Sequence, residues 1–268
     1  MTREFQFYII PTPIGNIKDI TLRAIEILKS VDYIACEDSR VTQKLLNHYD
    51  IKTKTISYHK FNETERVSSI LKILSEGKKV ALVSDAGTPL ICDPGSILIE
   101  KLRENNISIT SLTGSNAVST FLSQVPRKTE EYVFTGFLPR TENGIEELCN
   151  KFKYVNMVFY ESPNRILKSL EIIAKFRPDV KVSVGRELTK VFEEIIIDDI
   201  KNVINHFKDG VKGEIIAMLY ASEDNEIDKL KEKSEILKNK GFKSREIVEI
   251  LTSLYDNVNK NDVKSILY

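Results

Sequence analysis

Apolar residues form short runs separated by amphipathic stretches over the first part of the chain. Four runs rich in β-branched and aromatic residues predict buried strands: Phe5–Ile10, Tyr33–Cys36, Val80–Ser84 and Ile107–Leu112. Apolar residues at helical spacing lie between them, namely Leu22, Ile25 and Leu28, and then Val67, Ile70, Leu71 and Leu74. Asn62 and Glu65 predict a capping box at the start of the second of these helices. Alternating strands and helices predict a mainly parallel sheet covered on both faces.

A second series of apolar runs follows residue 130. Strands are expected at Tyr132–Phe134, Val155–Tyr160, Val180–Val184, Phe192–Ile197 and Glu214–Tyr220, with helical spacing at Ile166–Ile173. The segment 124–129, with the sequence QVPRKT, is the predicted hinge between two α/β lobes. The expected domains are therefore an N-terminal lobe, 1–124, and a C-terminal lobe, 125–222.

The remaining residues, 223–268, predict a small helical domain. Helices are expected at Ile227–Lys240, Ser244–Leu254 and roughly Asn261–Leu267, with Gly241 ending the first of them. A helix-turn-helix reader of DNA is one interpretation of this domain. A packing appendage is favoured, because its nearly balanced charges offer no positive recognition face.

Composition and charge exclude several classes. The 268 residues are 41% hydrophobic and 29% charged, which is typical of globular domains and unlike disordered or collagenous chains. Lys and Arg number 39, Asp and Glu also number 39, and no segment is a basic tail. Neutrality removes the usual footprint of a nucleic-acid binder, although it can conceal local patches.

Cysteine spacing and the N-terminal residues bear on compartment. Cys36, Cys92 and Cys149 are too widely spaced for a CxxC pair, so neither a disulfide framework nor a metal site is expected. A signal sequence and long apolar spans are missing from the pattern, so we expect a cytoplasmic protein without membrane association.

The chemistry-bearing residues lie where predicted strands end, which is where open α/β sheets bind ligands. Pro11–Asn16, PTPIGN, follows the first strand, and its Gly15 permits close approach. Ser84–Gly95, SDAGTPLICDPG, is a long loop of small and stiff residues, which is typical of a ligand loop. Its Asp85 can accept hydrogen bonds from a ribose or an ammonium group, and the amides of Ala86 and Gly87 are expected to be approachable.

Other strand ends add polar residues to the same predicted rim. Thr113–Ala117 lies between a strand and a helix, and the later loops carry FYESPNR (159–165) and GRELTK (185–190). Each Arg and Glu pair in these later loops has an alternative reading as a surface ion pair. GxGxxG and GxxxxGK are lacking, which disfavours dinucleotide binding and P-loop chemistry.

Taken together and in this order, these motifs resemble the tetrapyrrole (corrin/porphyrin) methylase superfamily. The similarity runs from about Tyr8 to Leu219 and is greatest to its ribosomal RNA small subunit methyltransferase I group. It is carried by PTPIGN, EDSR (37–40), HKFNE (59–63), SDAGTPL with DPG, GFLPR (136–140), FYESP and RELTK. The chain departs from the family pattern at LTGSNA (112–117), where LPGPSA is usual, and at Phe61 and Asn164, where histidines are common.

The resemblance implies a two-lobed, non-Rossmann α/β fold with S-adenosylmethionine between the lobes. No metal is expected beside it. Residues carried over by motif as cofactor-binding are Pro11, Pro13, Asp85, Ala86, Gly87, Thr88, Ile91, Ser115, Asn116, Ala117, Tyr160, Leu188, Gly213 and Glu214. The implied reaction is 2'-O-ribose methylation of a cytidine in small-subunit (16S) rRNA by a homodimer. Because the chain is neutral, an assembled ribosomal particle is the expected substrate.

A ribose hydroxyl is a poor nucleophile, so a neighbouring base should assist it. The candidate bases at strand ends are Glu37, Asp38, His59, Glu161 and Glu187, and the candidate phosphate contacts are Arg40, Arg140, Arg165 and Arg186. Our hypothesis is that Glu37 or Glu161 assists deprotonation while Arg40 and Arg186 orient the RNA. Two alternatives are a methylase of a tetrapyrrole or other small molecule, and a non-catalytic nucleotide-binding module that uses the helical tail on DNA.

Overall fold

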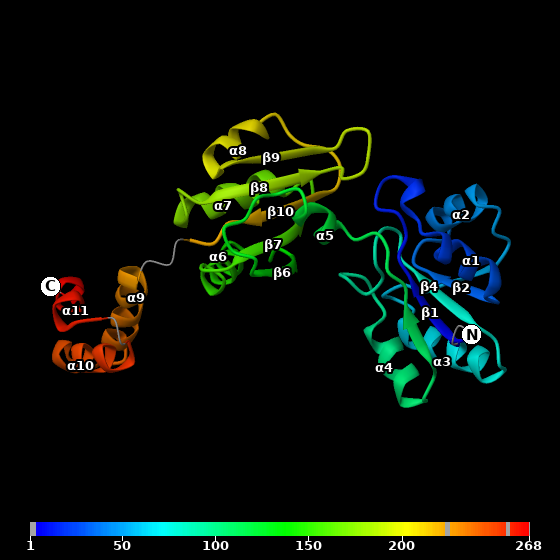
Figure 1. The fold of residues 1–268 in the computed structure, drawn as a ribbon, viewed down its shortest axis with the longest axis horizontal. Helices are drawn as coiled ribbons and strands as arrows, with labels where there is room; N and C mark the ends of the chain where they lie inside the picture. Colours follow the sequence, from blue (N-terminus) through cyan, green and yellow to red (C-terminus); the bar gives the residue numbers. More distant parts are fainter. Residues whose placement is uncertain (1–3, 223–225, 256–257, 268) are drawn as a thin grey trace. The chain divides into compact units, whose positions relative to one another are not determined.

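The chain divides into two compact units. The computed structural model describes residues 4–222, 226–255 and 258–267. The larger unit comprises Met1–Phe152 and Asn156–Tyr220, and the smaller comprises Lys153–Val155 and Ala221–Tyr268. Both sheets formed by the described residues belong to the larger unit, and so do the loops that carry the strand-end motifs (Figure 1).

The first sheet is parallel throughout. Its order is β3-β2-β4-β1-β5, and the register pairs Phe7 with Val80 and Tyr33 with Lys54. The strands are β1 (Phe7–Ile10), β2 (Tyr33–Cys36), β3 (Lys54–Ser57), β4 (Val80–Val83) and β5 (Ile109–Ser111). This arrangement confirms the mainly parallel sheet that the pattern predicted.

Helices cover both faces of this sheet. They are α1 (Leu22–Ser30), α2 (Ser39–His48), α3 (Glu63–Ser75) and α4 (Ser96–Glu104), with a short 3-10 turn at Ile17–Asp19. Leu28 and Leu46 pack against Ile34 on one face. Ile70 and Leu98 pack with Leu82 on the other. Apolar residues on both sides of each strand are the reason why these strands read as continuous hydrophobic runs.

The second sheet is mixed. Its order is β6-β7-β10-β8-β9, and among its pairs only β6 and β7 run parallel. The strands are β6 (Tyr132–Phe137), β7 (Asn156–Glu161), β8 (Lys181–Arg186), β9 (Glu194–Asp199) and β10 (Ile215–Leu219).

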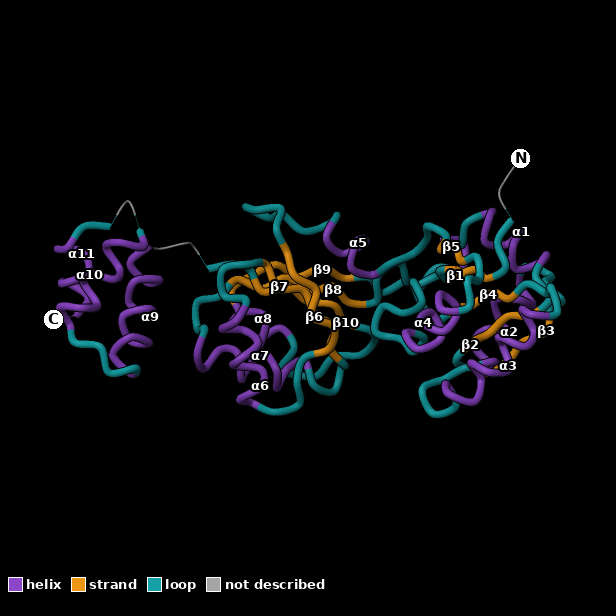
Figure 2. Tube along the Cα trace, turned by 90° about the horizontal axis from the view of Figure 1, so that it is seen from below, coloured by secondary structure: helices purple, strands orange, loops and turns teal. Residues whose placement is uncertain are grey.

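One face of the second sheet packs on α6 (Glu142–Lys151), α7 (Ile166–Phe176) and α8 (Ile200–His206). The short helix α5 (Ala117–Leu122) packs on the other face, so α5 lies across the strands from α6, α7 and α8 (Figure 2). The two faces of β7 divide accordingly, because Phe159 joins the first cluster and Val158 the second. Alternation along a strand therefore decides which side chains face α5.

The smaller unit is helical. It contains α9 (Glu226–Asn239), α10 (Ser244–Leu254) and α11 (Lys260–Leu267) around a core that includes Leu230, Ile247 and Leu251. Gly241 has a φ of 88° just after α9, and its amide donates to the Lys238 carbonyl at 2.9 Å. The predicted helices and the role of Gly241 in ending the first are confirmed over these residues.

One local prediction is wrong. Asn62 is the N-cap of α3, but its side chain makes no capping hydrogen bond. Its Oδ1 accepts from the His59 amide at 2.9 Å, and its Nδ2 donates to the Ser57 carbonyl at 3.3 Å. The side chain therefore closes the preceding turn, which competes with the capping box.

Candidate functional site

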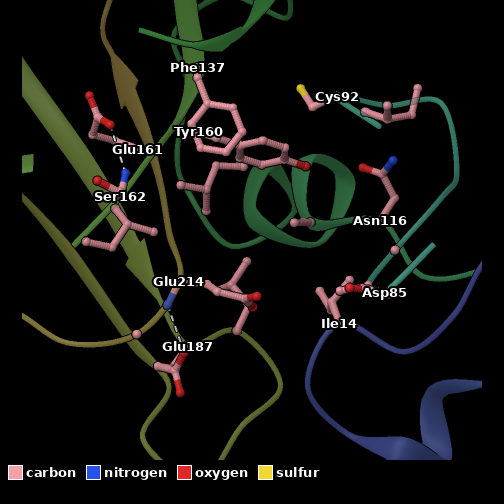
Figure 3. A pocket seen from close by; sticks show the side chains of 18 of the residues that line it. Ile14, Asp85, Cys92, Asn116, Phe137, Tyr160, Glu161, Ser162, Glu187 and Glu214 are labelled. Carbon is pink, nitrogen blue, oxygen red and sulfur yellow. Dashed lines mark hydrogen bonds between the residues drawn. The ribbon is translucent and has the colours of Figure 1, made fainter. Parts of the chain in front are cut away.

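A pocket of about 670 Å³ lies in the larger unit, with walls from loops of both sheets (Figure 3). This volume is within the range of small-molecule sites. The residues that line it are Ile14, Asp85, Ala86, Gly87, Thr88, Ile91, Cys92, Asp93, Asn116, Ala117, Phe137, Tyr160, Glu161, Ser162, Pro163, Glu187, Leu188, Lys190, Gly213, Glu214, Ile215 and Ile216. Most of the residues predicted to bind the cofactor are therefore brought together, and Pro11, Pro13 and Ser115 are outside this lining.

The loops after β1 and β4 are joined by an isolated bridge. The Thr12 amide donates to the Gly87 carbonyl at 2.9 Å, and the Gly87 amide donates back to the Thr12 carbonyl at 3.0 Å. Gly87 has a φ of 82°, which favours glycine at this position. Its amide was expected to be approachable by a ligand. That expectation is wrong, because the bridge already uses it.

The loop before α5 forms the adjoining wall. Asn116 caps α5, since its Oδ1 accepts from the amides of Val118 at 2.9 Å and Ser119 at 3.2 Å. The Thr88 hydroxyl donates to the Ser115 carbonyl at 3.1 Å, which ties this loop to the one after β4. Ser115 therefore supports the pocket wall to which Asn116 belongs.

Close backbone approach joins the first sheet's loops to the second sheet. A Cβ on Gly15 would lie 2.5 Å from the Leu188 carbonyl oxygen and 2.6 Å from Thr189 Oγ1. The Asn16 amide donates to Thr189 Oγ1 at 3.0 Å. Leu188 belongs to the same apolar cluster as Ile14. Only glycine allows this contact, so Gly15 determines how closely one pocket wall meets the other.

Aromatic rings form part of the second sheet's wall. Tyr160 meets Phe137 edge to face at a centroid separation of 5.7 Å (Figure 3). It also meets Phe134 edge to face, at 4.9 Å. Burial raises the pKa of Tyr160 to about 12, with further raising by Cys92, Asp93 and Glu214. The phenol is therefore neutral at physiological pH, and the rings give this wall a flat apolar surface.

A network of charged side chains closes the wall near β10. Lys190 Nζ lies 2.8 Å from Glu187 Oε1 and 3.0 Å from Glu214 Oε2. Glu187 also accepts from the Glu214 amide at 2.9 Å (Figure 3). The hydrogen bond from Lys190 is the main cause that lowers the pKa of Glu187. These partners leave Glu187 a poor proton acceptor.

Negative charge gathers at the opposite wall. Burial raises the pKa of Glu37, of Asp85 and of Asp93, the last to about 6. Neighbouring carboxylates raise each pKa further, since Asp85 acts on Glu37, Asp38 acts on Asp85, and both Glu37 and Asp85 act on Asp93. Asp38 itself pairs with Arg40 at 2.7 Å. Glu37 and Asp93 also line a small adjoining pocket.

Of the residues in our catalytic hypothesis, only Glu161 borders the main pocket. Its side chain is fully buried, with Oε1 accepting from the Ser162 amide at 2.8 Å and Oε2 from the Ser169 hydroxyl at 2.8 Å. Arg165 adds an ion pair to Glu161 at 3.2 Å. These contacts hold the turn after β7.

The arginines differ in how firmly they are held. Arg186 pairs with Glu194 at 3.0 Å, and Arg165 donates to the carbonyls of Leu138 and Pro139. Arg40 is 88% exposed but forms a bidentate contact with Asp38. The exposed Arg140 has no ion pair to a described residue. The structure therefore leaves Arg40 and Arg140 the most accessible to a polyanion.

Several lining residues were not singled out from the sequence. Ile14, Cys92, Asp93, Phe137, Ser162, Pro163, Lys190, Ile215 and Ile216 are of this kind. Most lie inside the motifs that carried the resemblance, beside residues that were named. The signal available in the sequence was that these residues belong to motifs at strand ends. The alternation of side-chain direction within each motif was not used to choose among the residues.

Within residues 4–222, 226–255 and 258–267, the structure groups no three His, Cys, Asp or Glu side chains suitably for a metal ion. The helices of the described chain all lack the length and apolar character needed to cross a membrane.

Two α/β sheets with a ligand-sized pocket lined by loops at their strand ends define a class of protein, and sequence comparison gives the name of that class. The family described as Tetrapyrrole (Corrin/Porphyrin) Methylases matches residues 6–204. The chain belongs to this family of methylases. Its curated relatives carry a more specific name, Ribosomal RNA small subunit methyltransferase I.

The relative from Hydrogenobaculum sp. is 44% identical over 219 residues, which cover 80% of this chain and 95% of that protein. The Bacillus subtilis relative is 37% identical over 268 residues, covering 96% of this chain and 91% of its own. Among solved structures, diphthine synthase aligns with a TM-score of 0.63 at 13% identity, covering 80% of this chain and 89% of its own. A cobalt precorrin-4 methyltransferase aligns with a TM-score of 0.60 at 20% identity, and the alignment covers 79% of this chain and 93% of that protein. These structures support the fold.

Proposed function

We propose that this protein is an S-adenosylmethionine-dependent methyltransferase that methylates the ribose 2'-hydroxyl of a cytidine in small-subunit (16S) rRNA. The observation that carries the proposal is the pocket of about 670 Å³, built from the motifs shared with the rRNA methyltransferase relatives. The cytidine and the 2'-hydroxyl come from the family resemblance of the sequence.

The lining residues fit S-adenosylmethionine in chemistry as well as volume. The donor carries a cationic sulfonium, an ammonium and a ribose, and Asp85 offers a carboxylate to such groups. The rings of Tyr160 and Phe137 offer an apolar surface to an adenine. Ala86, Thr88, Ile91, Asn116, Ala117, Leu188, Gly213 and Glu214 would contribute the remaining contacts, while Pro11, Pro13, Gly87 and Ser115 shape the loops.

When bound, S-adenosylmethionine supplies an electrophilic methyl group. The protein's own task is then to hold the acceptor hydroxyl in line with that methyl and to exclude water. The apolar side chains of Ile14, Leu188 and Ile216 serve the exclusion of water. Arg40 and Arg186 remain our proposed RNA contacts and Glu37 a proposed participant in catalysis, while the buried contacts of Glu161 favour a supporting role.

The proposed substrate is an assembled small-subunit particle, and the proposed acting form is a homodimer in the cytoplasm. The support for the particle is the chain's zero net charge, which offers little general attraction to a naked polyanion. Specific contacts with a folded particle would then carry much of the affinity. Protein-free rRNA is accordingly expected to bind more weakly.

The test is methyl transfer from labelled S-adenosylmethionine to three acceptors: small-subunit particles from a strain that lacks the protein, naked 16S rRNA and a precorrin or uroporphyrinogen. We expect label in the particles, at a cytidine ribose that alkaline-cleavage mapping identifies as 2'-O-methylated. Label on a base, or in the tetrapyrrole alone, would overturn the proposal. Duplex DNA binding with steep salt dependence would favour the non-catalytic alternative.

A further inference from the structure

Five carboxylates line the pocket in the described part of the chain: Asp85, Asp93, Glu161, Glu187 and Glu214. A carboxylate that takes a proton from a nucleophile must reach the pocket, and it is a weaker base when it already holds a hydrogen-bond donor or a cation. The partners of each one therefore decide which can act.

Four of the five are engaged elsewhere. Glu161 is fully buried between Ser162, Ser169 and Arg165. Glu187 and Glu214 share the ammonium of Lys190, and Asp85 Oδ1 accepts from the Asp38 amide at 3.1 Å.

Asp93 differs from them in its surroundings. It is half-buried and lies where the main pocket and the small adjoining pocket share a wall. The charged groups that act on it are the carboxylates of Glu37 and Asp85. The nearby Ser84 hydroxyl donates to the Gly87 carbonyl at 3.0 Å. In the described residues no Lys, Arg or His side chain forms an ion pair with it.

The backbone around Asp93 is strained. Leu90 and Cys92 both have a φ of 70°, a left-handed conformation that costs non-glycine residues of order 1–3 kcal/mol each. Gly95 follows with a φ of 137°, and a Cβ there would lie 3.2 Å from the Leu90 side chain. Such strain is concentrated at functional sites, and here it lies in the loop that carries Asp93.

We propose that the Asp93 carboxylate is the catalytic base of the reaction, accepting the proton of the hydroxyl that attacks the methyl group. The inference rests on the proposed function. The hydroxyl oxygen forms a bond to the methyl carbon while the methyl–sulfur bond breaks. The bonding electron pair leaves with sulfur as the neutral thioether, and the hydroxyl proton passes to an Asp93 carboxylate oxygen. The protonated Asp93 then returns its proton to solvent.

The electrostatics of the wall suit this role. Burial and the charges of Glu37 and Asp85 raise the pKa of Asp93 to about 6, while Ser84 lowers it. Asp38 also raises the pKa values of Glu37 and Asp85, while His59 lowers that of Glu37. The charge of Asp93 in turn raises the pKa values of the Cys92 thiol and the Tyr160 phenol. A base with a pKa near 6 is ionised at neutral pH and is more basic than an ordinary aspartate.

The test compares wild type with Asp93→Asn, which keeps the shape of the side chain and removes its basicity. At pH 7.5 we expect the single-turnover rate on small-subunit particles to fall about 100-fold or more. The dissociation constant for S-adenosylmethionine, measured calorimetrically without acceptor, should change by less than about threefold. The wild-type rate should rise with pH through an inflection near the pKa of Asp93, and this inflection should be missing from the Asp93→Asn profile.

Control variants distinguish a failure of this inference from a failure of the proposed function. Asp50→Asn removes an exposed carboxylate that pairs with Lys52 on the surface, and it should keep the wild-type profile. Asp85→Asn should keep the inflection, shifted to lower pH, because one neighbouring negative charge is lost. An Asp93→Asn protein as fast as wild type, or one that keeps the inflection, overturns the inference alone. Wild-type protein that binds S-adenosylmethionine and methylates no rRNA overturns the proposed function and the inference with it.

Discussion

At the scale of single residues, the wall at the end of β4 concentrates negative charge at a cost in stability. Protonation of Asp93, Asp85 or Glu37 would stabilise the folded protein, because burial and neighbouring charges raise the pKa values of these three carboxyl groups. An unfavourable buried charge of this kind serves the protein only if the charge takes part in binding or catalysis. Its cost can be measured through the pH dependence of unfolding.

The folded protein holds the Asp93 proton more tightly than the unfolded chain does. The free energy of unfolding should therefore fall as the pH rises from about 4 to about 6, and this contribution should be level above that range. Asp93→Asn should match wild type near pH 4 and exceed it by about 1–2 kcal/mol at pH 8, after allowance for partial solvent exposure. Urea denaturation at the two pH values checks this. An equal difference at both would contradict it.

Gly15 carries a second prediction at this scale. Gly15→Ala would place a Cβ 2.5 Å from the Leu188 carbonyl oxygen, so the loop must withdraw from the second sheet. We expect a loss of about 1–3 kcal/mol in unfolding free energy and a weaker affinity for S-adenosylmethionine. Gly77→Ala is the control, because space around it is open and only its φ of 79° opposes the change. It should lose about 1–2 kcal/mol and leave the affinity unaltered. Equal affinities in both variants would disprove the role of the contact.

At the scale of elements, one side chain serves both a helix and the pocket. The Oδ1 atom of Asn116 caps α5, while Asn116 also lines the pocket. Helix stability and ligand contact are therefore joined at this residue, and substitutions can separate them.

Asn116→Ala should cost about 1 kcal/mol of stability and should also weaken S-adenosylmethionine binding. Asn116→Asp keeps the capping oxygen and loses the amide donor, so only binding should suffer. Thr141 caps α6 by accepting from the Gly144 amide at 3.2 Å, and it lies outside the pocket lining. Thr141→Ala should therefore lower stability by a similar amount without affecting binding. Thermal unfolding and calorimetry together distinguish the three variants.

The elements differ in how well the sequence predicts them. The strands β2 and β4 are buried on both faces and read as YIAC and VALV, so hydrophobicity alone locates them. The edge strand β3, KTIS, is only partly buried and was not predicted. The antiparallel pairing of the second sheet was also not predicted. Because α5 and α6–α8 cover both of its faces, its strands carry the same continuous apolar runs as parallel ones.

The candidate site shows the same limit. Strand-end motifs predicted the loops, yet they could not tell Glu161 from Asp93. Glu161 follows Met157 and Phe159 at a spacing of two along β7, so its side chain faces α7 and is buried there. That alternation is readable in the sequence. The proximity of Asp93 to Glu37 depends on β2 and β4 being neighbours, which a pattern of single strands does not reveal.

At the scale of the whole molecule, the pocket belongs entirely to the larger unit. Its lining runs from Ile14 to Ile216, and the smaller unit has a core of its own. A chain that ends at Ser222 should therefore fold and bind S-adenosylmethionine within about twofold of the full-length affinity, a difference of about 0.4 kcal/mol. Calorimetry on both chains tests this. A tenfold loss of affinity would show that the helical unit contributes to the site.

The span of that lining has a consequence for the growing polypeptide. Domains generally fold in order during synthesis, and the parallel sheet is complete once Ser111 has been made. The pocket has to wait for β10, because Ile215 and Ile216 supply part of its wall. A nascent chain stalled before residue 210 should therefore carry a folded first sheet with no capacity to retain the methyl donor. Once β10 has formed, a bound ligand stabilises both sheets together, because separation of the two sheets would destroy the pocket.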